Sequence, residues 1–131
     1  MVSDRVGDFI IRLKNAGAIG NTSVVLPHSG HLEDIAKKLR DLGFVASVDV
    51  REKGGKKMLE VGLAYHENGV HKINDVKRIS KPGRRLYVSS RTAHSVKNGL
   101  GARIISTPKG ILADKEARQV KVGGEELFEI W

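Results

Sequence analysis

Apolar residues near the start of the chain recur with the period of a helix. Four of them fall at positions i, i+3, i+4 and i+7 and so share one helical face: Val6, Phe9, Ile10 and Leu13. Ser3 is placed to cap this helix, and the Gly- and Asn-rich segment 15–21 is expected to end it. Residues 24–26 then form a short apolar run closed by Pro27. The pattern predicts a helix followed by a strand.

The next segment repeats this order and adds a hairpin. Residues 32–39 again carry apolar positions at helical spacing, and Gly43 follows as a stop signal. Residues 44–50 alternate as a strand does, Gly54-Gly55 suits a two-residue hairpin turn, and residues 58–65 form the return strand. The helix–strand–helix–strand–strand order predicts a small two-layer α/β unit.

Beyond the polar segment 66–74 the pattern changes to short apolar runs separated by turn-forming pairs such as Gly123-Gly124. The expected strands cover residues 76–79, 85–88, 102–106, 111–112 and 127–131. One short helix is expected over residues 115–120, with Asp114 as its cap. This half of the chain is therefore predicted to be mostly β.

Size and composition fit this division. The 131 residues, 40% of them hydrophobic, are enough for one domain or two small ones. We expect an α+β fold with an N-terminal α-β-α-β-β domain at residues 1–66 and a mostly β domain at residues 67–131. No apolar run approaches the length of a membrane span, so no membrane partner is expected. The absence of cysteine excludes disulfides and thiolate metal sites and fits a reducing cytoplasm.

The charge narrows the class of partner. The chain carries 23 Lys and Arg against 15 Asp and Glu, a net charge of +8. Within residues 72–109 there is one acid, Asp75, against ten basic residues. These ten are Lys72, Lys77, Arg78, Lys81, Arg84, Arg85, Arg91, Lys97, Arg103 and Lys109. Such a stripe attracts phosphates and makes nucleic acid the first partner to consider, although solubility alone is an alternative reason for the charge.

The segment RISKPGRRLYV concentrates this charge around a Pro-Gly turn. Lys81, Arg84 and Arg85 flank the turn, and Tyr87 follows them. Strand alternation puts Tyr87 on the same face as Arg85 and opposite its apolar neighbours. Cations beside an exposed ring suit a folded RNA, whereas a Tyr87 packed into the core is the structural alternative.

The segment RIISTPKGILAD places two hydroxyls and a lysine between apolar arms. Thr107-Pro108-Lys109-Gly110 fits a four-residue turn with proline at the second position and glycine at the fourth. A rigid turn of this kind would hold Ser106, Thr107 and Lys109 outward, the hydroxyls for a base edge or 2′-hydroxyl and the lysine for a phosphate. An ordinary hairpin turn is the alternative.

Other chemistry finds little support. The five histidines do not have metal-ligand spacing, and Gly99-Leu100-Gly101 lacks the third glycine of a nucleotide fingerprint. No nucleophile motif surrounds Ser106 or Thr107, and no metal or other cofactor is expected. We therefore expect no enzyme. Two alternative functions remain. One is an enzyme acting on nucleic acid, which a turnover assay on RNA would detect. The other is a non-specific nucleic-acid chaperone, which would bind any RNA with the same salt dependence.

Three longer motifs carry a resemblance to a known family. RISKPGRRLYV, NGLGARIISTPKGILADKEAR and VGGEELFEIW strongly resemble bacterial small-subunit ribosomal protein S8. DRVGDFIIRLKNA and LEDIAKKLRDLGF look like the two N-terminal helices of that family. The resemblance covers nearly the whole chain and implies a two-domain α+β protein of the cytoplasmic ribosome.

The resemblance also implies a function and a set of contacts. The protein would bind an irregular helix in the central domain of small-subunit ribosomal RNA early in assembly, beside neighbouring ribosomal proteins, and would be a monomer outside the ribosome. In some bacteria the family represses its own operon through a messenger RNA that imitates this site. The implied RNA-binding residues are Ser106, Thr107, Pro108, Lys109, Gly110, Gly124, Glu125, Tyr87, Lys81, Arg84 and Arg85. Secondary contacts are implied near Asp4, Arg12 and Asn15. Charge alone suggests phosphate contacts by Lys53, Lys56 and Lys57 at the hairpin tip, and solvated hairpin side chains are the alternative.

The chain departs from the family pattern at three places. Pro108 stands where the family most often has serine, which removes a hydroxyl and a backbone donor. The segment His28 to His31 replaces serines and a lysine, so a phosphate contact there is in doubt. Arg103 stands at a commonly apolar position, where it is expected to contact phosphate or to face solvent.

Overall fold

The computed structural model describes residues 4–89 and 101–131. The expected cap Ser3, the basic residues Arg91 and Lys97 and the Gly99-Leu100 pair lie outside these ranges. The chain divides into two compact units, one formed by Asp8–Asn74 and the other by Met1–Gly7 together with Asp75–Trp131. Each unit contains antiparallel strands and helices, which confirms the α+β class.

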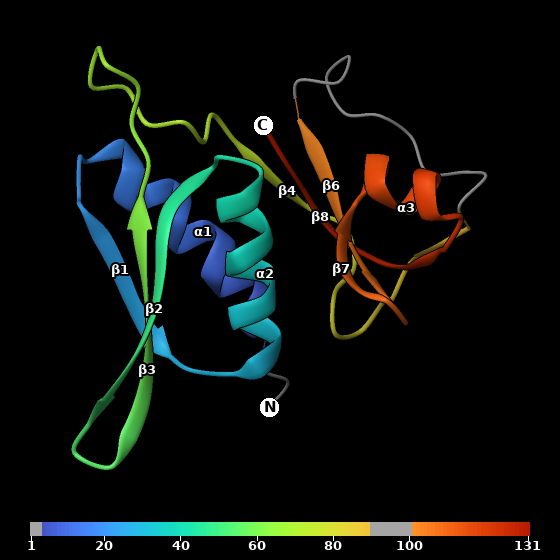
Figure 1. The fold of residues 1–131 in the computed structure, drawn as a ribbon, viewed down its shortest axis with the longest axis horizontal. Helices are drawn as coiled ribbons and strands as arrows, with labels where there is room; N and C mark the ends of the chain where they lie inside the picture. Colours follow the sequence, from blue (N-terminus) through green and yellow to red (C-terminus); the bar gives the residue numbers. More distant parts are fainter. Residues whose placement is uncertain (1–3, 90–100) are drawn as a thin grey trace. The chain divides into compact units, whose positions relative to one another are not determined.

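The Asp8–Asn74 unit follows the predicted α-β-α-β-β order. Its elements are α1 (Arg5–Ala18, which begins in the other unit), β1 (Ser23–Pro27), α2 (Gly30–Asp41), β2 (Val45–Lys53) and β3 (Lys56–Leu63). The strands form an antiparallel sheet in the order β1-β3-β2, with both helices on one side of it (Figure 1). The core comes from the predicted apolar stripes, because Phe9 and Leu13 of α1, Ile35 of α2 and Leu59 and Val61 of β3 are all fully buried.

The two ends of α1 are set by Asp4 and by the Gly- and Asn-rich segment 15–21. The carboxylate of Asp4, directly before the helix, accepts a hydrogen bond from the Gly7 amide at 3.0 Å, as a capping residue does. The helix ends at Ala18, inside the Gly- and Asn-rich segment 15–21 that was expected to end it, and takes in the first part of that segment. Gly17 is required inside the helix by packing, because a Cβ there would lie 2.3 Å from His71 Nδ1. That packing offsets the low helix propensity of glycine.

The other unit is a mostly β unit with one short helix, as predicted. Its elements are β4 (Val76–Arg78), β5 (Tyr87–Val88), β6 (Ala102–Thr107), β7 (Gly110–Ala113), α3 (Asp114–Val120) and β8 (Gly124–Ile130). The sheet runs β4-β8-β6-β7, with β5 also paired to β8, so β8 pairs with three strands. In the described part of the chain no helix is long and apolar enough to cross a membrane.

Two boundaries in this unit were predicted wrongly. The pair Gly123-Gly124 was expected in a turn, but Gly124 is the first residue of β8. Asp114 was expected to cap α3, but Ala113 holds the cap position and Asp114 is the first helical residue. The buried Asp114 carboxylate instead accepts hydrogen bonds from the Arg103 amide at 3.0 Å and from Arg118 Nη1 at 3.1 Å. It thereby ties α3 to β6.

Candidate nucleic-acid interface

The turn between β6 and β7 is closed by the Thr107 side chain. Thr107 pairs with Gly110 across the hairpin, which leaves Pro108 and Lys109 as the two exposed loop residues. Thr107 Oγ1 donates to the Gly110 carbonyl at 2.7 Å and accepts from the Lys109 amide at 3.1 Å. Gly110 has a φ of +112°, a value that favours glycine. The Thr107 hydroxyl, which was expected to read RNA, closes its own turn in the free protein.

Strand register brings three of the expected residues into one row. Glu125 of β8 lies opposite Tyr87 of β5 on one side and Ser106 of β6 on the other. Directly opposed residues in antiparallel strands point to the same face of the sheet, so all three side chains share a face. Tyr87 is 70% exposed, which confirms its predicted orientation and removes the alternative of a core tyrosine. The Ser106 side chain makes no hydrogen bond with the residues that the structure describes.

Glycine is needed at position 124 for the spacing of this row. A Cβ on Gly124 would lie 2.0 Å from the carbonyl oxygen of Ser106 and 3.1 Å from Thr107 Cα. These are backbone atoms of β6, which cannot move away without disturbing the sheet. Gly124 thus lets β8 approach β6 at the end of the strand pair where Ser106 and Glu125 lie.

The basic loop, residues 81–85, is held by a serine that the sequence analysis did not single out. Lys81 and Arg84 exchange two backbone hydrogen bonds of 2.9 Å around Pro82-Gly83. The fully buried Ser80 accepts from the Leu86 amide at 2.9 Å and donates to the Leu86 carbonyl at 3.1 Å. The two ends of the loop are therefore clasped together. In the sequence, the role of Ser80 is indicated only by its position, as a small polar residue two positions before a Pro-Gly turn.

Arg85 and Glu125 form an ion pair on the exposed face of this sheet. Arg85 Nη1 lies 2.9 Å from Glu125 Oε2, and the Glu125 side chain is 17% exposed. This hydrogen bond, with the attraction of the carboxylate, raises the pKa of the Arg85 guanidinium. The carboxylate is thus held in a fixed position with part of its charge compensated, and it keeps acceptor capacity for an external donor.

Of the expected secondary contacts, Asp4 and Arg12 are used within the protein, whereas Asn15, Lys56 and Lys57 are exposed. Asp4 Oδ1 binds Arg78 Nη2 at 2.6 Å in addition to capping α1. Arg12 Nη1 donates to the Val25 carbonyl of β1 at 3.2 Å, and its Nε lies 3.4 Å from Asp8. Asn15 is exposed and lines a shallow groove of about 440 Å³ between α1 and β1. Lys56 and Lys57 are exposed at the end of the β2–β3 hairpin.

Arg103 is largely buried and paired within the protein, which corrects the expectation that it faces solvent. It is 19% exposed and binds two carboxylates of β8, those of Glu126 and Glu129. Burial alone would lower the pKa of its guanidinium, but the hydrogen bonds to Glu129 and Glu126 outweigh burial and raise it. The residue is a buried tie between β6 and β8.

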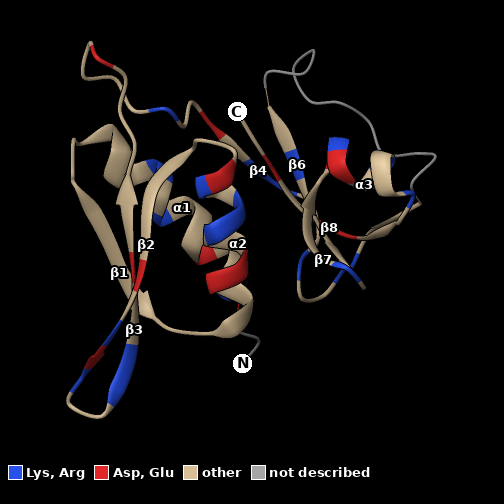
Figure 2. Cartoon of the chain, viewed as in Figure 1, with Lys and Arg blue, Asp and Glu red and all other residues tan. Residues whose placement is uncertain are grey.

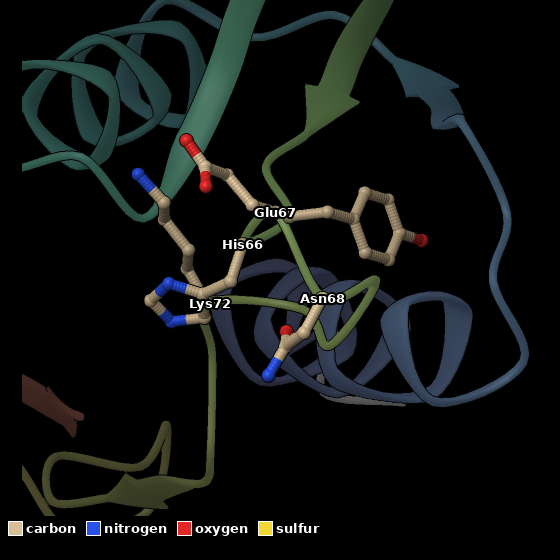
Figure 3. A pocket seen from close by; sticks show the side chains of 5 residues that line it. His66, Glu67, Asn68 and Lys72 are labelled. Atoms are coloured by element: carbon tan, nitrogen blue, oxygen red, sulfur yellow. The ribbon is translucent and has the colours of Figure 1, made fainter.

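Two further features carry no chemistry of a catalytic or metal site. His28 Nε2 is 2.7 Å from Glu33 Oε1, and among the described residues no group of three or more His, Cys, Asp or Glu could hold a metal ion. A cavity of about 700 Å³ is lined by His66, Glu67, Asn68 and Lys72, with Tyr65. Its labelled side chains point in different directions and include none of the expected RNA-binding residues (Figure 3).

The sequence is similar to those of known ribosomal proteins along its whole length. A family model described as Ribosomal protein S8 matches residues 4–131. A small ribosomal subunit protein uS8 of Nautilia profundicola is 42% identical over 131 residues that cover both chains completely. Proteins of the same name from Streptococcus equi subsp. zooepidemicus, at 40% identity over the whole chain and 99% of the relative, and from Nitratiruptor sp., at 43% over both whole chains, are similar.

These matches remove the enzyme from the functions left open by the sequence. Members of this family are structural components of the ribosome, a cytoplasmic assembly, and they are not enzymes, which confirms the expectation that the chain is not an enzyme. The matched range takes in both compact units and every motif on which the resemblance rested. The chain therefore belongs to the ribosomal protein S8 family.

Proposed function

We propose that this protein binds an irregular helix in the central domain of small-subunit ribosomal RNA, through one face of the β5–β8–β6 sheet, and promotes assembly of the subunit. The observation that carries the proposal is the row of Tyr87, Glu125 and Ser106 beside the closed β6–β7 turn. A ring, an acceptor and a free hydroxyl lie side by side at strand spacing, on backbone that the sheet holds rigid.

Each member of the row has chemistry suited to an unstacked or distorted base pair. The exposed ring of Tyr87 offers a surface on which a base or sugar can stack. Glu125 accepts from base amino groups or 2′-hydroxyls, and a carboxylate at this place repels phosphates, which favours an exposed base edge. The Ser106 hydroxyl can donate and accept. Regular duplex RNA offers no unstacked base to the Tyr87 ring, so the row supports selectivity.

Affinity comes from the cations around the row. Lys109 lies exposed on the β6–β7 turn, and Lys81 and Arg84 lie on the clasped basic loop. Their contacts with phosphates release counterions and carry no sequence information. Pro108 contributes a fixed φ to the turn instead of a hydrogen bond. Gly124 and Gly110 act through backbone geometry, since a side chain at either position would disturb the row or the turn.

The proposal extends to partners of the same chemistry. The free protein is a monomer that meets neighbouring small-subunit proteins once it is bound to ribosomal RNA. A messenger RNA with the same irregular helix would occupy the same row, so repression of the protein's own operon is part of the proposal.

The first test is a binding titration across a salt series with two RNAs. One is the irregular small-subunit helix and the other is a regular duplex of equal length. We expect a clear preference for the irregular helix that Ser106→Ala reduces by about tenfold, the value of one lost specific hydrogen bond of about 1.4 kcal/mol. Ser23→Ala is the matched control, because it removes a half-buried strand hydroxyl from the other sheet.

Binding of the regular duplex should not change in the Ser106→Ala variant. If the wild-type protein binds both RNAs equally, with affinities that fall together as salt rises, the protein is a basic module without the proposed selectivity. Equal losses on both RNAs in the Ser106→Ala variant would show that the hydroxyl supports affinity and does not discriminate between RNA shapes.

A further inference from the structure

The end of the β2–β3 hairpin is exposed on both faces. All nine residues from Asp49 to Lys57 are exposed, although strands of this length normally bury alternate side chains. The neighbouring strand β1 ends at Pro27, opposite Met58, so the last two rungs of the hairpin have no third strand beside them. Figure 1 shows this two-stranded arm projecting past the end of β1. The arm contributes little to the core, and its exposure needs another explanation.

The hairpin tip, residues 51–57, holds lysines in an arrangement that is unfavourable for the free protein. Lys53 lies directly opposite Lys56, and like charges at such positions repel. Lys57 follows, and no carboxylate of the described residues forms an ion pair with any of these three ammonium groups. By contrast, Arg51 on the same arm is paired with Glu60 at 2.9 Å.

The turn at the end of the arm fixes this repulsion in place. Gly54 and Gly55 have φ values of +60° and +78°, the left-handed values of a tight two-residue hairpin turn. Nothing lies within 4 Å of the position that a Cβ would take at either glycine. The tip is therefore narrow, free of side chains at its apex and strongly positive. Figure 2 shows the basic residues gathered on it.

We propose that the hairpin tip is a second RNA contact, in which Lys53, Lys56 and Lys57 bind phosphates outside the irregular helix held by the other unit. The inference rests on the proposed function and adds a separate contact region to it. Phosphates placed around the tip would screen the repulsion between the opposed lysines, so an arrangement that costs the free protein stability favours the complex. A side-chain-free apex lets an RNA backbone approach closely.

The composition of the tip favours RNA over a protein partner. Protein interfaces are built around a buried apolar or aromatic centre. Residues 51–57 contain four basic side chains, one acid and two glycines, and no apolar side chain. Charge without an apolar anchor is the composition of a sequence-independent phosphate contact.

The test compares two triple variants of the full chain that have the same net charge. K53Q/K56Q/K57Q removes the three lysine charges of the hairpin tip, and K37Q/K38Q/R40Q removes three charges from α2 of the same unit. Each is titrated with the isolated irregular helix and with RNA of the whole central domain, over a salt series. We expect the two variants to bind the isolated helix equally. On the longer RNA the tip variant should bind at least tenfold more weakly than the α2 variant, and its salt slope should fall by about 2.7, for three phosphates.

A melting temperature at or above that of the wild type would show that the tip variant is folded, since it loses a like-charge pair. Equal affinities and equal salt slopes of the two variants on the longer RNA would overturn the second contact while leaving the first intact. If the wild-type protein showed no preference for the irregular helix over a regular duplex, the proposed function itself would be refuted. The two failures are therefore distinguishable.

Discussion

Replacing Gly124 by alanine separates a packing role from an RNA-contact role at this position. The family resemblance places Gly124 among the RNA-binding residues, whereas the fold gives it a role in the free protein. An alanine Cβ would lie 2.0 Å from the Ser106 carbonyl oxygen, about 1 Å closer than such contacts allow. The β8 and β6 backbones must move apart by a similar distance, since neither atom belongs to a flexible side chain.

The cost of this movement can be worked from the local contacts. Overpacking of a well-packed site typically costs about 1–3 kcal/mol. A separation of about 1 Å also weakens the rung between Ser106 and Glu125, at about 0.5–1.5 kcal/mol for each hydrogen bond lost. We therefore expect Gly124→Ala to destabilise the protein by about 2–4 kcal/mol, a large share of the stability of a small domain. The melting temperature should fall by about 5–15 °C.

Thermal and urea unfolding of the RNA-free protein measure this directly. Gly30→Ala is the control, because Gly30 is exposed at the start of α2 with nothing within 4 Å of its Cβ position. It should leave the melting temperature unchanged or raise it slightly, since alanine is the better helix former. If Gly124→Ala melted with the wild type and lost only RNA affinity, the packing argument would be refuted and the position would act through the RNA alone.

Three further predictions concern single side chains. Thr107→Val should weaken binding to the irregular helix because it removes both hydrogen bonds that close the turn, whereas Thr107→Ser keeps them and should bind like the wild type; equal binding by both variants in the titration would contradict this. Ser80→Ala leaves the half-buried Leu86 amide without the acceptor of the buried Ser80, so we expect a loss of about 1–3 kcal/mol in denaturant unfolding and weaker binding to both RNAs, although Ser80 touches neither. The pKa of Glu33 is lowered by its hydrogen bond to Lys37 and then by the neighbouring histidine, so its carboxylate stabilises the fold above its ordinary pKa of 4.5. Glu33→Gln should thus be less stable than the wild type at neutral pH, and the difference should shrink as the pH falls from 4.5 through the lowered pKa of Glu33, where the wild-type group becomes protonated; a difference that does not shrink as the solution is acidified below pH 4.5 would exclude the charge as its cause.

Local pattern was sufficient for most of the fold. Helical and alternating periodicities located every described element to within a few residues, because burial of one face is what these patterns encode. The errors arose where a distant residue decides local structure. Gly17 stays helical because His71 packs against it, and Gly124 belongs to a strand because Ser106 lies across the sheet. A prediction that treats every glycine as the end of a helix or strand cannot include either of these long-range contacts.

Contacts between residues far apart in the sequence also limited the prediction of the candidate site. The exposure of Tyr87 followed from alternation, but its alignment with Glu125 and Ser106 depends on register between strands far apart in the sequence. The destinations of polar side chains were the least predictable. Arg103 was expected outside and is buried between carboxylates, and the Thr107 hydroxyl was expected to face a ligand and closes its own turn. Polar groups find partners wherever the fold offers them, and composition does not reveal which.

The position of β8 in its sheet has a consequence for the order in which the protein forms during synthesis. β8 pairs with β4, β5 and β6, and all three precede it in the chain. A nascent chain can complete Asp8–Asn74 as soon as that segment has emerged, whereas the other unit lacks its central strand until Ile130 has been made. A frameshift or premature stop shortly before Gly124 would thus spare one unit and leave the other with only the β6–β7 hairpin, so that quality control would meet a half-folded product with exposed apolar strands.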